Sequence, residues 1–252
     1  MNFNISGKSV LVVGASKGIG RAIAKAYAEE GAIVTAIARS ESQLKSLIEE
    51  IGGPNSVHRY FVFDMMETGM PTKASQLLLE DYKYFDIVIQ CIGGIYKSRD
   101  PFSSIEFWIN EWIFNVGIAI EMNNILIPPM VKRGWGRIIH ISSISSKMLR
   151  GNVLYTCAKS YLNAYVINMG RLLANKGIIV SALMPGAVEF KDSYWEKIRN
   201  NNPDKYFGFL KEHQAIGRMG KPEEIAAFAV FLGSEQASFA AASLITVDGG
   251  NM

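Results

Sequence analysis

The chain has 252 residues, of which 49% are hydrophobic and 19% charged, with a formal net charge of +3. This apolar fraction is enough for a packed core and excludes a disordered chain, and the small net charge is not typical of a nucleic-acid-binding protein. Two cysteines are too few for a disulfide framework, and we see no secretory leader or membrane span, so we expect a cytoplasmic protein.

Apolar runs and segments of helical period alternate along the chain. In chain order they predict a strand at 8–14, a helix at 18–30, a strand at 32–38, a helix at 40–51, a strand at 56–64, a helix at 70–83, a strand at 85–93, a helix at 104–132, a strand at 137–142, a helix at 153–175, a strand at 178–184, a helix at 222–233 and a strand at 243–248. We expect Pro128 and Pro129 to end or kink the long helix.

Continuous apolar strands separated by helices are typical of a parallel sheet with both faces covered. We therefore predict a doubly wound α/β fold of about seven strands, built as one domain over residues 1–252. One segment, residues 189–214, interrupts the alternation between the sixth strand and the last helix. We interpret it as a lid over the substrate.

A glycine-rich turn joins the first predicted strand to the first helix, with Gly14, Gly18 and Gly20 as its glycines. Gly14 permits a tight turn, Gly18 lets the backbone approach a pyrophosphate, and Gly20 allows close packing of helix on strand. In this strand–turn–helix context the turn predicts dinucleotide binding.

The end of the second strand indicates which dinucleotide is bound. An acidic residue there would bind the adenosine ribose, but this chain has Arg39 followed by Ser40. Arg39 can pair with a 2′-phosphate and Lys17 can add a second cation, so we predict NADP(H) rather than NAD(H). Asp64, at the end of the third strand, could meet the adenine amino group or simply cap the strand.

Tyr155 and Lys159 stand four residues apart on the predicted helix after the fifth strand, which places both side chains on one helix face. A cation there favours the phenolate and is expected to lower the tyrosine pKa from about 10 toward physiological pH. Together with the glycine turn, this motif resembles the short-chain dehydrogenase/reductase family in its compact branch, over essentially the whole chain. The resemblance implies a Rossmann fold and an oxidoreductase that reduces a ketone or oxidises a secondary alcohol.

In this family a catalytic serine follows the fifth strand, and here Ser142 and Ser143 both fit that place. Asn115, in Phe114-Asn115-Val116-Gly117, matches the family's asparagine segment, and Ser143 follows it by 28 residues, a spacing that members commonly show. We therefore favour Ser143 and keep Ser142 as the alternative.

The resemblance implies the remaining roles. Tyr155 would exchange the proton, Ser143 would stabilise the carbonyl oxygen, Lys159 would bind the nicotinamide ribose, and Asn115 would hold a water that connects Lys159 to solvent. We predict no metal, because the three histidines lack ligand spacing. The predicted cofactor contacts are Gly14, Ser16, Lys17, Gly18, Ile19, Gly20, Arg39, Ser40, Asp64, Ile92, Gly93, Tyr155, Lys159, Pro185, Gly186 and Val188.

Some positions depart from the family pattern. Gln90 and Cys91 replace asparagines after the fourth strand, Phe190 stands where a threonine often meets the nicotinamide, and Ala242 replaces a glycine. The Ser143, Tyr155 and Lys159 group is intact, so we favour an active enzyme. The alternative is a non-catalytic NADP-sensing regulatory or scaffold protein.

Basic residues follow several strands and recur in the lid, where they alternate with aromatic side chains. They suggest an anionic or carrier-bound substrate, of the 3-oxoacyl or sugar type, and Lys132, Arg133, Arg171 and Lys176 could dock an acidic acyl carrier protein. The helices at 104–132 and 153–175 carry more apolar residues than one sheet face requires. By resemblance, we expect these helices to build a homotetramer, with a dimer as the alternative.

Overall fold

The computed structural model of the protein describes residues 3–53 and 56–251, so that residues 1–2, 54–55 and 252 of the predicted domain lie outside the described part. Within that part, seven strands form one parallel sheet in the order β3-β2-β1-β4-β5-β6-β7. The strands are β1 (Ser9–Val13), β2 (Ile33–Ala38), β3 (Arg59–Val62), β4 (Ile87–Gln90), β5 (Gly136–Ile141), β6 (Ile178–Pro185) and β7 (Leu244–Val247). Each overlaps a predicted strand, and the predicted doubly wound α/β fold is confirmed.

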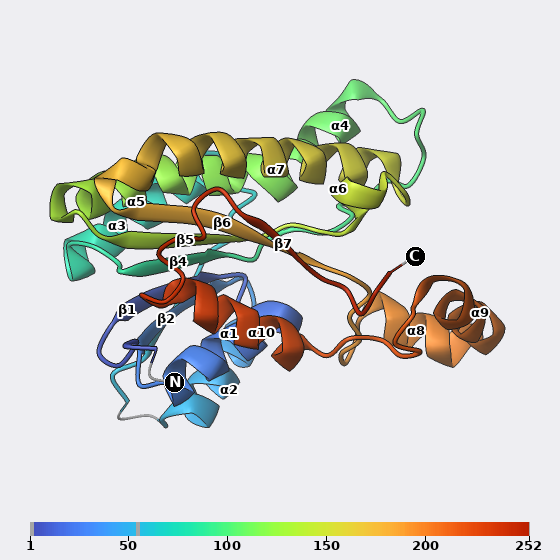
Figure 1. The fold of residues 1–252 in the computed structure, drawn as a ribbon, viewed down its shortest axis with the longest axis horizontal. Coiled ribbons are helices and arrows are strands. Elements are labelled where there is room, and N and C mark those ends of the chain that lie inside the picture. Colours follow the sequence, from blue (N-terminus) through green and yellow to red (C-terminus); the bar gives the residue numbers. More distant parts are fainter. Residues whose placement is uncertain (1–2, 54–55, 252) are drawn as a thin grey trace.

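Helices cover both faces of this sheet. Helices α1, α2 and α10 lie on one face, and α3, α5 and α7 lie on the other (Figure 1). The helices are α1 (Gly18–Glu29), α2 (Glu41–Ile51), α3 (Met70–Tyr82), α4 (Ile105–Trp112), α5 (Ile118–Arg133), α6 (Ser145–Met148), α7 (Val153–Leu173), α8 (Tyr194–Asn201), α9 (Pro203–His213) and α10 (Pro222–Gly233). A short 3₁₀ turn, Ala174–Lys176, follows α7.

The burial of each strand depends on its position in the sheet. The inner strands β4, β5 and β6 are buried at every position, whereas the edge strands β3 and β7 are partly exposed. The strand order reverses where β1 pairs with both β2 and β4. In open α/β sheets, ligands bind outside the carboxyl ends of the strands at such a switch point.

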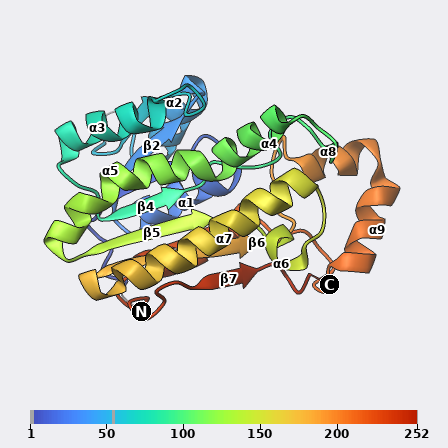
Figure 2. The same ribbon diagram turned by 90° about the horizontal axis from the view of Figure 1, so that it is seen from above.

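The long helix predicted at 104–132 is a continuous helical run of three pieces. Between α4 and α5 lies a turn of π-helix, Ile113–Gly117 (Figure 2 shows the run). Pro128 and Pro129 do not end α5, which continues to Arg133. The carbonyl of Asn124, which loses its helical partner at Pro128, lies on the exposed side of α5, where water can satisfy it. Met130, on the opposite side, is buried.

The predicted lid forms two helices, α8 and α9, between β6 and α10. Tyr206 of α9 packs with Ala187 and Met219 in a small core of its own. The lid is also tied to the end of the chain (Figure 1), because the Gln214 amide bonds both Asp248 and Asn251.

His140, in the middle of β5, is completely buried. Its Nε2 lies 3.3 Å from Nδ2 of Asn123, and its ring meets Tyr165 edge to face. Burial lowers the pKa of His140 to about 3, and the nearby Lys159 charge adds to this effect. His140 is therefore a neutral core residue at physiological pH.

This buried histidine should make the fold sensitive to acid. The unfolded chain protonates His140 below its ordinary pKa of about 6.5, whereas the folded chain does not until pH approaches 3. We expect the free energy of unfolding to fall by up to about 1.4 kcal/mol per pH unit across this window because of His140 alone. In urea denaturation at several pH values, the free energy of unfolding of His140→Gln should depend less steeply on pH than that of the wild type. The partly exposed His213 provides the control, His213→Gln, and equal slopes for the two variants would contradict this account.

Candidate active site

The turn between β1 and α1 has room only for glycine at two positions. Gly14 has a φ of +89°, and a Cβ there would lie 2.9 Å from the carbonyl oxygen of Cys91. A Cβ at Gly20 would lie 2.2 Å from the carbonyl oxygen of Gly14. The side chain of Lys17, the N-cap residue of α1, makes no capping hydrogen bond. The first N–H groups of α1 therefore remain available for an anion.

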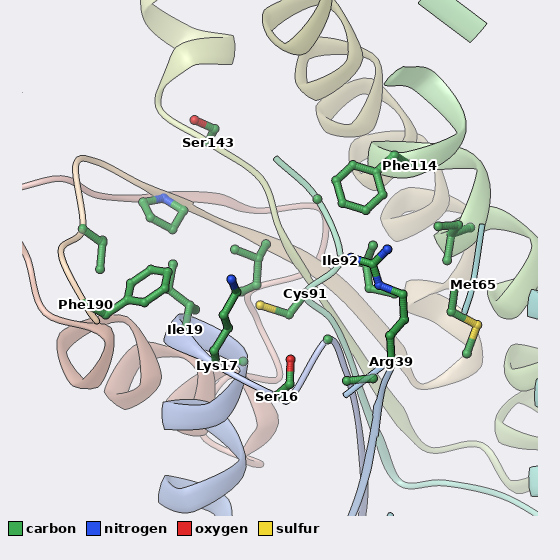
Figure 3. A pocket seen from close by; sticks show the side chains of 18 of the residues that line it. Ser16, Lys17, Ile19, Arg39, Met65, Cys91, Ile92, Phe114, Ser143 and Phe190 are labelled. Carbon is green, nitrogen blue, oxygen red and sulfur yellow. The ribbon is translucent and has the colours of Figure 1, made fainter. Parts of the chain in front are cut away.

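A cleft of about 630 Å³ opens beside this turn (Figure 3). Most of the predicted site residues line it: Gly14, Ser16, Lys17, Ile19, Gly20, Arg39, Ser40, Asp64, Ile92, Gly93, Ser143, Tyr155, Lys159, Pro185, Gly186 and Val188. In the described structure Gly18 and Asn115 are not among the lining residues. The ring of Phe190 covers Gly18, and Asn115 lies next to Gly93.

Tyr155 stands in the first turn of α7, where its N–H donates to the Asn152 side chain at 2.9 Å. Burial raises the pKa of Tyr155, and a hydrogen bond with the Ser143 side chain partly opposes the rise. The sequence suggested a pKa lowered by Lys159, but the pKa of Tyr155 is raised, with burial as the largest cause. Ser142, the alternative to Ser143, donates its hydroxyl to Asn163 at 2.6 Å instead.

Lys159 lies one turn further along α7 and is only 2% exposed. Its ammonium donates to the carbonyl of Ile141 at 2.9 Å and lies 5.8 Å from the centroid of the Tyr155 ring. Burial lowers the pKa of Lys159 to about 8, while Cys91 and Glu111 act in the opposite direction. The lysine is thus a buried cation at neutral pH.

Asn115 lies in the π-helical turn, where its side chain connects two segments. Its Oδ1 accepts from Gly94 N at 2.9 Å, and its Nδ2 donates to Gly94 O at 2.9 Å and to the carboxylate of Glu111 at 2.8 Å. Glu111 is a buried acid beside the site that sequence reasoning missed. The available signal was a carboxylate four residues before Asn115, one helical turn away.

Arg39 is 67% exposed at the mouth of the cleft, where its guanidinium lies 3.7 Å from Asp64. The other oxygen of Asp64 accepts from the N–H of Met66 at 3.0 Å. Asp64 therefore caps the chain after β3, one of the two roles considered for it. Ser40, the next residue after Arg39, is the N-cap of α2.

Aromatic side chains close the cleft on the lid side. Phe190 and Trp195 line it, and Trp195 packs on Phe209 with ring centroids 4.2 Å apart. Figure 3 shows Phe190 beside Ile19 and Lys17 of the glycine turn. Phe190 was noted in the sequence only as a departure. Its contact with the turn depends on how the chain after β6 folds back.

Three arginines, one of the lid and two of the loops after β4 and β5, make contacts within the protein. Arg199 pairs with Glu189, Arg99 lies 5.0 Å from the Tyr194 ring centroid, and Arg150 donates to Asn251 at 2.7 Å. In the described structure, the only lysines and arginines among the cleft-lining residues are Lys17, Arg39 and Lys159. The positive charge lining the cleft therefore comes from residues predicted to contact the cofactor.

Residues 3–53 and 56–251 lack two kinds of feature. They contain no group of three His, Cys, Asp or Glu side chains that could hold a metal ion. Nor do they contain a helix long and apolar enough to cross a membrane.

Gly93 and Gly94 offer a matched test of how closely the site is packed. Both have positive φ, but a Cβ at Gly93 would lie 2.7 Å from Lys159 Nζ and 2.8 Å from Asn115 Oδ1, whereas one at Gly94 would meet only Phe114, at 4.0 Å. Both alanine variants carry backbone strain, and Gly93→Ala adds a clash. We expect Gly93→Ala to be less stable than Gly94→Ala by about 1–3 kcal/mol in urea denaturation. Equal stability would show that Lys159 and Asn115 move aside freely.

Comparison with known proteins extends this description. Residues 14–251 match the family model described as Enoyl-(Acyl carrier protein) reductase. The chain is 30% identical over 254 residues to the 3-oxoacyl-(acyl-carrier-protein) reductase of Chlamydia muridarum, with 99% of each chain covered.

Solved structures agree with the family match. A 3-oxoacyl-(acyl-carrier-protein) reductase from Agrobacterium tumefaciens with NADP bound has a TM-score of 0.91 at 26% identity, covering 99% of this chain and 96% of that one. The L-sorbose reductase of Gluconobacter frateurii, complexed with NADPH and L-sorbose, has a TM-score of 0.90 at 28% identity, covering 99% and 98%. The chain therefore belongs to the short-chain dehydrogenase/reductase family of oxidoreductases.

Proposed function

We propose that this protein is an NADP(H)-dependent carbonyl reductase in which Tyr155 exchanges the proton. The observation that carries the proposal is the meeting of Ser143, Tyr155 and Lys159 in the same cleft as the glycine turn and Arg39. A surface pair of tyrosine and lysine would lie in water, whereas Lys159 is 2% exposed. Such burial is expected of a lysine that serves a reaction site.

The residues present fit a dinucleotide phosphate. The uncapped N-terminus of α1 offers N–H groups to a pyrophosphate, and the missing side chain at Gly14 brings the turn against the end of β4. Arg39 and Lys17 line the same cleft and would hold a 2′-phosphate. The two solved relatives described above contain NADP and NADPH, respectively, which supports the same choice here.

The bound cofactor would supply the hydride, and the protein's residues would manage the proton and the charge. Ser143 would donate to the carbonyl oxygen and stabilise the negative charge that grows there. Tyr155 would donate its phenolic proton to that oxygen. Burial raises the pKa of Tyr155, so the hydroxyl stays protonated at neutral pH, which suits reduction better than oxidation. Lys159 would bind the nicotinamide ribose, and Asn115 would hold a water beside it.

For the substrate, we propose a ketone of the 3-oxoacyl or sugar type. The two relatives with named substrates differ in this respect, since one is a 3-oxoacyl reductase and the other reduces L-sorbose. The pairing of Arg199, Arg99 and Arg150 within the protein weakens the argument for an anionic group. At the predicted carrier-docking patch, Arg133 is held by Asp86 at 2.8 Å.

We also propose a homotetramer built on α4 and α7, with a dimer as the alternative. These helices expose apolar side chains that neither the sheet nor the other described helices cover: Ile105, Phe107, Ile109, Tyr161 and Leu172. Exposed apolar surface of this kind marks an interface.

Replacing Tyr155 tests the catalytic proposal. We expect Tyr155→Phe to lower kcat/KM by at least about 10²-fold, because the proton donor is lost, while NADPH fluorescence still reports binding. The assay follows NADPH absorbance with a keto-sugar and with a 3-oxoacyl thioester. Tyr161→Phe, on the exposed side of the same helix, is the control and should keep its activity. Undiminished turnover by Tyr155→Phe would overturn the mechanism.

Replacing Arg39 tests the cofactor. A charge-assisted contact with a phosphate contributes about 1.5–3 kcal/mol, so Arg39→Asp should weaken NADPH binding by at least about tenfold and leave NADH binding unaffected. Arg59→Asp is the matched control, because Arg59 is exposed at the start of β3 and pairs with Asp81 at 3.9 Å. Fluorescence titration measures both cofactors. An equal loss for NADPH and NADH would refute the 2′-phosphate contact.

A further inference from the structure

Glu111 is an ionisable side chain at the site for which the proposed reaction has no use. It lies in α4 and is 1% exposed. A carboxylate taken out of water is costly unless it is paired and hydrogen-bonded. Both of its oxygens are engaged, since Oε1 accepts from Asn115 Nδ2 at 2.8 Å and Oε2 accepts from the N–H of Tyr96 at 2.9 Å.

Glu111 and Gly94 together determine which way the Asn115 amide points. Its Nδ2 donates to the carboxylate and the backbone carbonyl of Glu111, at 2.8 and 3.0 Å, and to Gly94 O at 2.9 Å. Its Oδ1 accepts from Gly94 N at 2.9 Å. Oδ1 and Lys159 Nζ both flank Gly93, within 2.8 Å of the position that a Cβ would take. A reversed amide would turn an N–H group toward this ammonium.

The second bond holds the chain that follows β4. Through Tyr96, Glu111 holds the segment after the cleft-lining residues Ile92 and Gly93, and Asn115 holds the same segment at Gly94. One carboxylate thus supports both the asparagine and the backbone beside the lysine.

The site also contains two opposite charges that interact, those of Lys159 and Glu111. The buried ammonium of Lys159 donates to a neutral carbonyl, that of Ile141, so that contact does not balance its charge. Burial raises the pKa of Glu111, and the hydrogen bonds from Tyr96 and Asn115 and the charge of Lys159 oppose this rise. The charge of Glu111 in turn favours the charged form of Lys159. The other titratable groups that interact with the pair are Tyr155, Cys91 and the buried His140.

We propose that Glu111 is a positioning residue for the Tyr155–Lys159 pair, acting as the buried counter-charge of Lys159 and, together with Gly94, fixing the side-chain orientation of Asn115. The inference rests on the proposed function and adds an ionisable group to its site. Glu111 contacts neither the cleft nor the reacting atoms directly, so it acts through Asn115 and through its charge.

The charge of Glu111 has a measurable consequence. Its negative charge raises the pKa of both Lys159 and Tyr155. Without this charge, Lys159 and Tyr155 should therefore both lose their protons at lower pH. Because the two groups are coupled, the apparent pKa values of the pair should both fall. A side chain that only filled space would change stability without moving this titration.

The experiment is an ultraviolet titration of tyrosinate in the free protein. Subtracting the same protein with Tyr155→Phe isolates the signal of Tyr155. We expect Glu111→Gln, which keeps the size of the side chain, to shift the Tyr155 midpoint to lower pH. The matched control is Glu106→Gln, which removes the same charge from an exposed position on the same helix and should leave the midpoint unchanged. A Glu111→Gln midpoint equal to that of wild type would overturn the proposal.

A second measurement applies if Glu111→Gln does not fold. Carbon-13 NMR of the glutamate carboxyls, with Glu111 assigned, gives the pKa of Glu111 in the wild type and in Lys159→Met. Loss of the lysine charge should raise that pKa, and an unchanged value would overturn the proposal. Neither experiment needs cofactor or substrate. Failure here is thus distinguishable from failure of the proposed reaction, which the turnover of Tyr155→Phe decides.

Discussion

The burial of the Lys159 ammonium is the constraint on which the rest of the site depends. An ammonium that is 2% exposed needs hydrogen bonds and a nearby opposite charge, since an unpaired buried ion is strongly destabilising. The carbonyl of Ile141 supplies one contact, and the missing side chain at Gly93 leaves the space that Nζ occupies. The π-helical turn brings Asn115 beside the same glycine, and Glu111 lies behind it. If Lys159 faced water, none of these features would have an evident structural reason.

The parallel sheet joins this group to the glycine turn. Because β1 pairs with β4, Val13 lies opposite Gln90, and the next residues of the two strands meet. Cys91 N donates to Val13 O at 2.9 Å, and the absence of a Cβ at Gly14 lets the two chains touch. The two ends of the cleft are thus parts of one hydrogen-bonded unit. The distance between the expected phosphate site and the expected reaction site is therefore determined by strand register, not by mobile loops.

The sequence predicted the sheet and most of the residues that line the cleft, because buried parallel strands and glycine turns leave strong local patterns. It did not predict the π-helical turn, since a single turn of five residues is too short to show a period of its own. Of the two outcomes predicted for Pro128 and Pro129, ending the helix was wrong, because helix-ending propensity ignores which carbonyls can reach water. Glu111 and Phe190 were missed as site residues for a common reason. Their contacts join segments that lie far apart in the chain or depend on how deeply a side chain is buried. The type of a single residue reveals neither property.

The division between cleft and lid explains why the catalytic group says little about the substrate. Ser143, Tyr155 and Lys159 are held by the core strands and by α7, whereas Phe190 and Trp195 come from the segment after β6, which has its own small core around Tyr206. Because the lid folds around its own core, its side chains that face the cleft can change without disturbing the buried charge of Lys159. Arg199 of the lid and Arg99 and Arg150 of other segments already contact groups within the protein, so the net charge of +3 does not describe the proposed substrate site. We therefore propose that substrate choice depends on the shape of the aromatic wall, because the proposed catalytic residues require only a carbonyl group.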